Sequence, residues 1–482
     1  MTTAEQQHAA DDRPAGPGGD LATGAHDQQV PEAYAAFMRQ GWGSRRLELP
    51  RHPAADRTAD RRRTVAEAFP DERLVVPAGT FKVRANDTDY RFRADTAHVH
   101  LTGNQTSDAV LVVEAGESVL YARPRSSRDT DEFFRDRRYG ELWTGRRPSL
   151  AEISDSLSLE VRHLDDLEAR LRDGAKTRVL RGVDALVDGT VPSDPVRDTE
   201  LERVLSELRL VKDDWELAQL QEACDITTLG FADSVREWDE VLLHGERWLE
   251  GTFFRRARAM GNDLGYDSIV ASGSHATTLH WTENSGAVRP GELLLLDMGV
   301  EGRHLYTADV TRTLPVDGTF TAVQRDLYSL VLAAQQAGID AVRPGAGFQA
   351  PHDAAMHVLA HGLADLGLLP VSAEEALSPE SKVYTRWTLH STSHMLGLDV
   401  HDCAAAAPEA YKFGELAEGM VLTVEPGLYF QEDDLLVPEE LRGIGIRIED
   451  DIVVTADGSA NLSHALPREP EAVEAWMAGL RA

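Results

Sequence analysis

The sequence predicts a mixed α/β (α+β) protein with a smaller amino-terminal domain and a larger carboxy-terminal one. The chain has 482 residues, which is enough for two domains with substantial cores. Short apolar runs alternate with amphipathic helical stretches up to about residue 200, a pattern typical of α/β domains. A strongly helical stretch from about 200 to 235 then opens a second series of apolar runs.

Composition excludes several classes of partner. The net charge is -32, so neither nucleic acid nor an anionic membrane surface is expected as a main partner. Hydrophobic residues make up 42% of the chain, which indicates a globular protein. The two cysteines fit a reducing compartment, and the first residues have neither the basic nor the apolar region of a signal peptide. We therefore expect a cytoplasmic protein without a membrane-spanning segment.

The amino-terminal half reads as a tail followed by an α/β domain. Residues 1–30 are polar and rich in Pro and Gly, which predicts a disordered tail. The domain itself is expected over 31–205. Its predicted helices lie near 31–38, 59–69, 149–159 and 163–171, and its predicted strands at 73–77, 90–93, 109–113 and 118–121, the last two forming a hairpin. His98 and His100 would share one face of a further strand, in a structural role.

The second domain is expected over 206–482. Its first helix carries Trp215, Leu217, Leu220 and Cys224 at helical spacing, and another helix is predicted near 246–264.

An apolar strand in this domain ends in a carboxylate. Four leucines lead into Asp297, and a turn then returns the chain through Asp309. A buried unpaired charge costs several kcal/mol, so two such acids side by side must share a proton or be neutralised by cations. Pairing of one acid with Arg312 is the simpler alternative.

Four further stretches place polar groups among apolar residues. The first contains Tyr266 and leads to His280, where a short strand is expected to end. The second holds three histidines within twelve residues, and the third ends a strand at Glu425. In the fourth, period-two alternation puts Arg447 and Glu449 on one face; Arg447 could simply pair with Glu449. The histidines of the second stretch are His390, His394 and His401.

Together these stretches predict a site for two cations. Asp297, Asp309, Glu425 and Glu449 lie at strand ends or on inner faces, and His394 joins them. Four carboxylates carry about -4, which two divalent cations neutralise. Oxygen ligands with one imidazole favour Mn²⁺, with Co²⁺ or Zn²⁺ as alternatives. A metal pair of this kind activates water for hydrolysis.

At these residues the chain resembles the pita-bread metallopeptidases, most closely the aminopeptidase P family. The resemblance covers about 208–455 and extends more weakly to the amino-terminal domain, at Leu101-Thr-Gly103 and Trp143-Thr-Gly-Arg-Arg147. It implies a pita-bread (creatinase/aminopeptidase-like) catalytic domain that binds two Mn²⁺ ions. The implied reaction is hydrolysis of the bond between an N-terminal residue and a following proline by a hydroxide bridging the metals.

The resemblance also implies a role for each site residue. Asp309 and Glu449 would bridge the metals, and Asp297, His394 and Glu425 would complete the ligand set. Glu425 would also move the proton of the nucleophile, and Arg447 would hold Glu449 and a neighbouring acid. His401 would contact the scissile carbonyl; His280 and His390, with Tyr266, would line the substrate pocket. A homodimer or homotetramer is expected.

Two positions depart from the family pattern. Asp297 and Asp309 are one residue further apart than expected, which predicts a bulged turn near 300–304. Ser391 stands where glycine is common and is expected to narrow the proline pocket.

Alternative functions remain open at this stage. A prolidase would share the same metal ligands but accept only dipeptides, and a methionine aminopeptidase fits less well because of the long amino-terminal domain. A metal-free creatinase-like hydrolase or a pita-bread peptide-binding module would be expected to lack ligand carboxylates.

Overall fold

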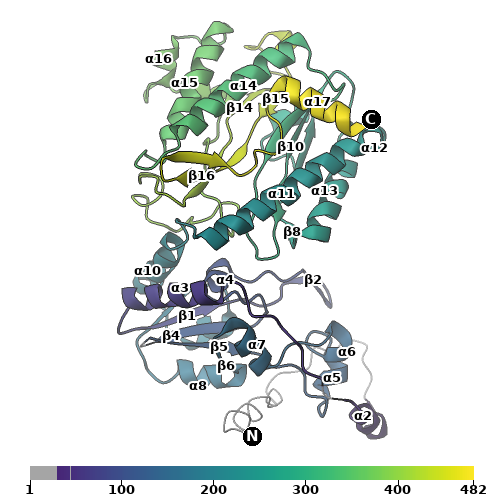
Figure 1. Ribbon diagram of the computed structural model, residues 1–482, viewed down its shortest axis with the longest axis vertical. Coiled ribbons are helices and arrows are strands. Elements are labelled where there is room, and N and C mark those ends of the chain that lie inside the picture. Colours follow the sequence, from purple (N-terminus) through teal and green to yellow (C-terminus); the bar gives the residue numbers. More distant parts are fainter. Residues whose placement is uncertain (1–29, 44, 115, 482) are drawn as a thin grey trace. The chain divides into compact units, whose positions relative to one another are not determined.

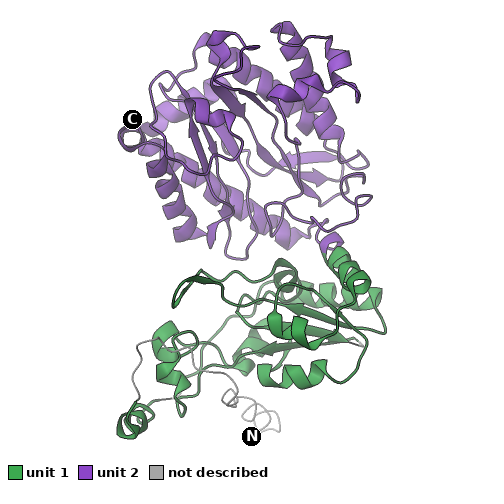
Figure 2. Cartoon of the chain, turned by 180° about the vertical axis from the view of Figure 1, so that it is seen from behind, with its two compact units in different colours: residues 1–205 green, residues 206–482 purple. Residues whose placement is uncertain are grey.

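The computed structural model describes residues 30–43, 45–114 and 116–481. The chain forms two compact units, residues 1–205 and 206–482, which Figure 2 colours separately. Of the tail expected over residues 1–30, residues 1–29 lie outside the described part. Among the described helices, none combines the length and apolar character needed to cross a bilayer.

Unit 1 mixes short helices and strands, as the sequence predicts (Figure 1). Its helices are α2 Glu32–Met38, α3 Ala55–Ala68, α4 Thr96–Thr102, α5 Glu132–Arg135, α6 Glu141–Thr144, α7 Leu150–Leu157, α8 Leu167–Leu171 and α9 Ala185–Thr190, with α10 Pro195–Glu207 at the boundary. Its strands are β1 Arg73–Pro77, β2 Val83–Ala85, β3 Thr88–Asp89, β4 Val110–Glu114, β5 Glu117–Ala122, β6 Glu160–His163 and β7 Thr177–Val179.

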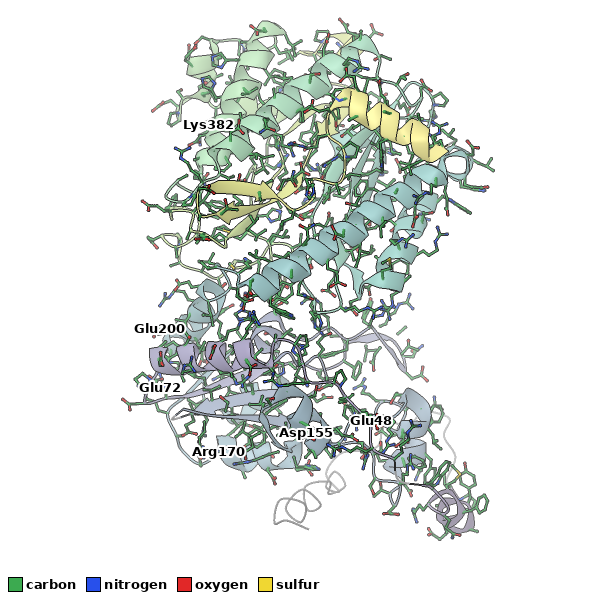
Figure 3. All side chains as sticks on the ribbon, viewed as in Figure 1. Glu48, Glu72, Asp155, Arg170, Glu200 and Lys382 are labelled. Atoms are coloured by element: carbon green, nitrogen blue, oxygen red, sulfur yellow. The ribbon has the colours of Figure 1, made fainter. Side chains whose placement is uncertain are left out.

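A five-stranded sheet of order β6-β5-β4-β1-β7 organises unit 1. The predicted hairpin is present, because β4 and β5 pair antiparallel with Val112 opposite Val119. At one edge, Glu72 (labelled in Figure 3) accepts hydrogen bonds from Arg178 and Lys176 at 2.8 and 2.7 Å. These two contacts join the residue before β1 to strand β7 and the residue that precedes it.

Two predictions for unit 1 are wrong. His98 and His100 lie on helix α4, which Asp95 caps by accepting from the N–H groups of Ala97 and His98. The cap residue sets the helix where the sequence suggested a strand. The strand expected at 90–93 is absent from the assigned strands, and the neighbouring hairpin forms earlier, from β2 and β3.

The helical stretch predicted from about 200 to 235 is divided into α10 and the long helix α11. A capping box between Asp213 and Glu216 closes the first turn of α11. The other helices of unit 2 are α12 Trp238–His244, α13 Glu246–Met260, α14 Ala322–Ala341, α15 Ala350–Asp365, α16 Ala373–Leu377 and α17 Pro470–Arg481, and α11 itself spans Asp214–Arg236. The strands of unit 2 are β8 Asp263–Leu264, β9 Ile269–Ser272, β10 Leu293–Asp297, β11 Val300–Glu301, β12 Thr311–Pro315, β13 Val421–Val424, β14 Gly427–Phe430, β15 Ile444–Arg447, β16 Asp450–Thr455 and β17 Gly458–Asn461.

Small antiparallel sheets form the centre of unit 2. They have the orders β12-β10-β9, β13-β16-β17, β14-β15 and β11-β8. Helices cover them in two groups, visible in Figure 1: α11 packs with α13, which contacts β9, while α14 packs with α15 and contacts β13 and β15. The main core lies between strands and helices and includes Leu294, Leu296 and Phe253.

The hairpin around the paired acids forms with the expected direction. Strands β10 and β12 pair antiparallel, with Asp297 opposite Thr311. The intervening turn adds a short strand, β11, and places Leu305 at a φ of 67°. Gly299 is required here, since a Cβ at this position would lie 1.8 Å from the carbonyl oxygen of Ala308. The short strand expected to end at His280 is not formed; a 3₁₀ turn, Gly273–Thr277, follows β9 instead.

Candidate metal centre

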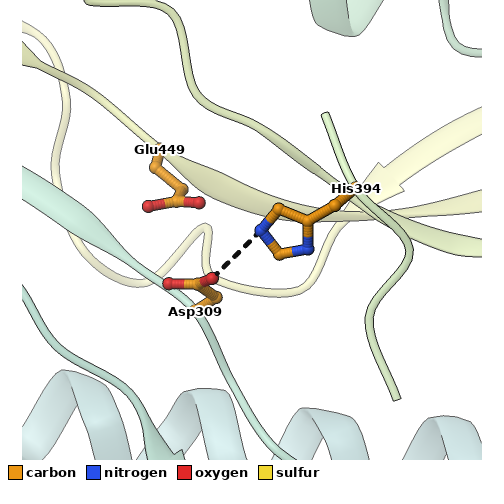
Figure 4. A group of neighbouring side chains, drawn as sticks. All are labelled: Asp309, His394 and Glu449. Atoms are coloured by element: carbon orange, nitrogen blue, oxygen red, sulfur yellow. Dashed lines mark ion pairs between the residues drawn. The ribbon is translucent and has the colours of Figure 1, made fainter. Parts of the chain in front are cut away.

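Three side chains from separate parts of unit 2 meet at one point. One ligand atom each from Asp309, His394 and Glu449 lies within 4.8 Å of the others (Figure 4). The Nε2 atom of His394 is 3.3 Å from Oδ2 of Asp309, the ion pair that Figure 4 marks. The geometry therefore brings together three of the five ligands expected from the sequence.

Strand ends deliver the carboxylates to this point. Strand β10 is buried at every position and ends at Asp297. Glu425 follows β13 directly, and Glu449 immediately precedes β16, which pairs with β13. The main-chain N–H and C=O groups of these apolar strands are hydrogen-bonded to neighbouring strands. The acids at the strand ends can therefore lie in the interior without disrupting the sheets.

Asp297 is held by two donors. The hydroxyl of Tyr266 donates to Oδ1 at 2.6 Å, and Nη2 of Arg447 donates to Oδ2 at 2.5 Å. Asp297 is therefore oriented from both sides before any cation binds.

The direct partner of Arg447 differs from the simplest expectation. Arg447 pairs with Asp297, whereas its link to Glu449 runs through Thr311: Nε of Arg447 donates to the Thr311 hydroxyl at 3.2 Å, which donates to Glu449 at 2.6 Å. Pairing of Arg312 with Asp309 is also not seen, because Arg312 binds Asp450 at 2.7 Å.

Glu425 lies between two histidines. Its Oε1 is 3.6 Å from Nε2 of His394, and its Oε2 is 3.5 Å from Nδ1 of His390. The other nitrogen of His390 is 2.8 Å from the hydroxyl of Tyr429, which also accepts from Nη1 of Arg447 at 3.0 Å. A continuous polar chain thus connects Glu425 to Asp297.

The pKa values show how much negative charge is concentrated here. Burial raises the pKa of Glu425 to about 7, with Asp309 and Asp297 adding to the rise against His394 and Arg447. Burial and the charge of Asp309 raise the pKa of Glu449 well above its usual value. Burial opposes protonation of His394, but Asp309 and Glu425 outweigh it and raise its pKa to about 9. The same ion pair outweighs burial at Asp309, whose pKa is lowered.

This donor set fits divalent cations. Asp297, Asp309 and Glu449 are buried and Glu425 is half-buried. These four acids face one guanidinium and one imidazole, so protons must replace missing positive charge when no metal is bound. Carboxylate oxygens with one imidazole suit hard or borderline divalent ions rather than a thiolate-preferring metal. Cations at this point would neutralise the excess charge that raises these pKa values.

The remaining histidines lie on the open side of the site. His280 and His401 are exposed, and the rings of His394 and His401 are 4.3 Å apart. Burial, followed by the charge of His394, lowers the pKa of His401. Burial, followed by the charge of Arg447, lowers the pKa of His390 to about 4, so its imidazole is neutral at pH 7. Neutral imidazoles can accept or donate hydrogen bonds to a substrate.

Sequence reasoning gave no role to Tyr429, Thr311 or Asp451, although it placed Asp451 on one face with Arg447 and Glu449. Tyr429 and Thr311 link Arg447 to His390 and Glu449, and their positions on strands β14 and β12 gave no separate signal. Asp451 accepts from the main-chain N–H of Asp309 at 3.0 Å and from the thiol of Cys224 at 3.2 Å. Its place two residues after Glu449, on the same strand face, was the available clue.

Comparisons with known proteins agree for both units. The family model "Metallopeptidase family M24" matches residues 218–456, and "Aminopeptidase P, N-terminal domain" matches residues 58–180. The chain is 53% identical to Xaa-Pro aminopeptidase 2 of Streptomyces coelicolor over 92% of this chain and 96% of that protein. It is 52% identical to Xaa-Pro aminopeptidase 1 of the same organism, over 94% of this chain and 93% of that protein.

A solved structure confirms the predicted fold class. A variant of Escherichia coli aminopeptidase P in complex with substrate is 30% identical, with a TM-score of 0.78 over 89% of this chain and 99% of that one. The arrangement is thus an aminopeptidase P amino-terminal domain followed by a pita-bread catalytic domain. The chain belongs to metallopeptidase family M24 and, within it, to the aminopeptidase P group.

Proposed function

We propose that this protein is an Xaa-Pro aminopeptidase, which hydrolyses the bond between an N-terminal residue and a following proline. The observation that carries the proposal is the convergence of Asp309, His394 and Glu449 within 4.8 Å. It occurs in a chain about half identical, over nearly its whole length, to proteins named for that activity.

We assign the metal site to two divalent cations. Asp297, Asp309, His394, Glu425 and Glu449 would hold the ions, and the family resemblance implies that Asp309 and Glu449 would serve both of them. Mn²⁺ is the first choice for this oxygen-rich set, with Co²⁺ and Zn²⁺ as alternatives; one solved relative is described as zinc-substituted. Bound there, the cations polarise the scissile carbonyl and lower the pKa of the attacking water.

Glu425 is assigned the proton transfer. It accepts the proton of the attacking water on a carboxylate oxygen and then delivers it to the leaving proline nitrogen. His390 lies beside this carboxylate, with its Nδ1 atom 3.5 Å from Oε2, and Tyr429 holds the imidazole through its Nε2 atom.

Three histidines, the exposed His280 and His401 and the half-buried His390, are assigned to substrate binding. His401 donates to the oxygen of the scissile carbonyl, and His280 and His390 line the pocket for a peptide with proline at its second position. Tyr266 was expected to bind substrate as well, but its hydroxyl donates to Asp297. We therefore assign Tyr266 to orienting that ligand, and Arg447 to the same task from the other side.

A substrate and metal series tests this function. The purified protein, depleted of metal by chelation and then given Mn²⁺, Co²⁺ or Zn²⁺, is assayed on Xaa-Pro-Xaa, Xaa-Pro and Xaa-Ala-Xaa peptides. We expect metal-dependent release of the first residue from Xaa-Pro-Xaa. Cleavage confined to the dipeptide would make the protein a prolidase, and activity that survives exhaustive chelation would refute the metal mechanism.

We further propose a cytoplasmic homodimer or homotetramer. Both cysteines, Cys224 and Cys403, are free and buried, which suits a reducing compartment. The subunit number is proposed from the family resemblance, and exposed large apolar side chains such as Phe37 (74%) and Leu435 (82%) are candidates for the contact. Light scattering on the full chain gives the subunit number; a monomer would contradict this assignment.

A further inference from the structure

Glu246 is a fully buried acid outside the metal site, and four donors surround it. It is the first residue of α13, with 0% of its side chain exposed. Its Oε1 accepts from the main-chain N–H of Ser272 at 2.9 Å and lies 2.8 Å from Nδ1 of His275. Its Oε2 accepts from the indole N–H of Trp281 at 3.0 Å and from the main-chain N–H of Gly286 at 2.6 Å.

These four donors come from one loop, residues 272–286, which carries His280. They lie at its start, near its middle on both sides of His280, and at its end. The His275 and Trp281 rings stack with centroids 3.9 Å apart, which joins the two limbs of the loop. Trp281 is the immediate neighbour of His280, so the carboxylate of Glu246 fixes the residue beside that histidine.

The packing around the carboxylate depends on glycine. A Cβ at Gly286 would lie 2.5 Å from Cε1 of His275 and 2.7 Å from Oε1 of Glu246. The main chain of Glu246 also donates to the carbonyl oxygen of Gly286 at 3.0 Å. The carboxylate, the histidine and the end of the loop therefore form one packed unit.

The returning limb has a second anchor. Buried Asn284 accepts from the N–H of Val270 and donates to the carbonyl oxygen of Ser268, each at 2.9 Å. His280 itself stays exposed, and it lies near enough to His390 and His401 to contribute to the lowering of the pKa of both. Hydrogen bonds to Glu246 and Asn284 thus hold the loop in place, while the imidazole of His280 stays accessible.

We propose that Glu246 is a positioning residue for peptide hydrolysis: its carboxylate holds the 272–286 loop so that His280 meets the substrate. The inference rests on the proposed function, because it takes His280 as part of the substrate pocket. Glu246 touches neither substrate nor metal and acts only through the loop.

Glu246→Gln is the most direct test. The two oxygens of Glu246 accept from main-chain N–H groups at opposite ends of the loop, Ser272 and Gly286. An amide has one oxygen, so one of these N–H groups then faces an NH₂ group and is left unsatisfied. Glu250→Gln is the matched control, since Glu250 lies one turn further along the same helix and is half-buried.

We expect Glu246→Gln to lower kcat/KM on an Xaa-Pro-Xaa peptide by about ten- to a hundredfold, with metal content unchanged and Glu250→Gln at the wild-type value. In a His280→Ala background, Glu246→Gln should change kcat/KM by less than about twofold. A similar fall in both backgrounds, or no fall in either, would overturn the inference.

Hydrogen exchange separates this inference from the proposed function. Residues 272–286 should lose protection in Glu246→Gln and keep it in Glu250→Gln, whether or not the peptide is cleaved. Unchanged protection overturns the inference, whereas a wild-type protein that leaves Xaa-Pro-Xaa peptides intact overturns the proposed function. If Glu246→Gln does not fold, Trp281→Phe removes one donor and keeps an aromatic ring; it should reduce both kcat/KM and protection, and wild-type values would refute the proposal.

Discussion

Glu449 and Asp450 are neighbours in sequence and equally buried, yet their surroundings differ completely. Asp450 accepts from Arg312 at 2.7 Å, from Ser463 at 2.5 Å and from Gln335 at 2.9 Å, and Arg468 lies 3.4 Å away. Glu449 accepts a hydrogen bond from Thr311, and burial together with the charges of Asp309, Glu425 and Asp297 outweighs the charge of Arg447, so its pKa is raised.

The difference separates structural acids from ligands. An acid buried with its donors stabilises the fold in the conformation it already has. An acid buried against like charges is destabilising until a cation arrives. Burial alone therefore does not mark a metal-binding carboxylate; the balance between like charges and donors around it separates Glu449 from Asp450.

Removing a shared ligand should have the largest effect. Asp309→Ala or Glu449→Ala is expected to abolish metal occupancy and lower kcat by about a thousandfold or more, because each acid is assigned to both ions. Metal analysis after dialysis and a peptide assay measure the two losses together. A variant with near-normal turnover would remove that residue from the ligand set.

Neutralising the structural acid should destabilise the protein instead. Asp450→Asn leaves an NH₂ group facing donors and weakens a buried ion pair, so unfolding free energy should fall by about 3 kcal/mol. Urea denaturation in chelator measures it, with Asp457→Asn, in the exposed turn before β17, as control. Equal unfolding free energies of the two variants would show that the negative charge of Asp450 does not stabilise the fold.

His401 tests where the ligand set ends. His401→Ala is expected to retain both metals and lower kcat by about a hundredfold, because the side chain is exposed and is assigned to the scissile carbonyl. Metal content and steady-state kinetics distinguish this from a ligand loss. Loss of bound metal in this variant would place His401 inside the donor set.

The smallest expected effect is on the stability of the metal-free protein. Glu425→Gln should stabilise it, whereas Asp450→Asn should destabilise it. The pKa of Glu425, raised to about 7, exceeds its unfolded value of about 4.5, so the metal-free fold favours the protonated carboxyl. Stability is therefore lost as pH rises from about 4.5 through 7. In chelator, Glu425→Gln should be more stable than wild type by about 1–3 kcal/mol at pH 8 and equal to it near pH 4.5.

Denaturation with saturating Mn²⁺ supplies the control for that comparison. There the sign should reverse, because wild type gains binding energy that the amide variant lacks. A metal-free variant less stable than wild type at pH 8 would show that Glu425 behaves like Asp450.

The sequence predicted the fold class and family, because strand and helix periodicity and the order of motifs are local signals. Apolar strands ending in acids indicated where Asp297 and Glu425 would lie, although the roles of the site residues stay predictions. His98 was misplaced because an N-cap at Asp95 overrode its strand-like surroundings. The partner of Arg447 could not be read from the sequence, because alternation on one strand favours Glu449, whereas Asp297 reaches it across the sheets.

Glu246 shows a second limit. Its four donors lie 26 to 40 residues away and converge only through tertiary packing. No spacing rule connects a helix start to both ends of a loop.

Arg447 and Asp297, which meet at the metal centre, are separated by 150 residues along the chain. At ribosomal elongation rates of about 5–20 residues per second, Asp297 leaves the ribosome roughly eight to thirty seconds before its partner. The amino-terminal unit can fold in this interval, while the hairpin carrying Asp297 and Asp309 must wait for β15 and β16. A nascent chain therefore presents no complete binding site to cellular metal until β15 and β16 have been synthesised.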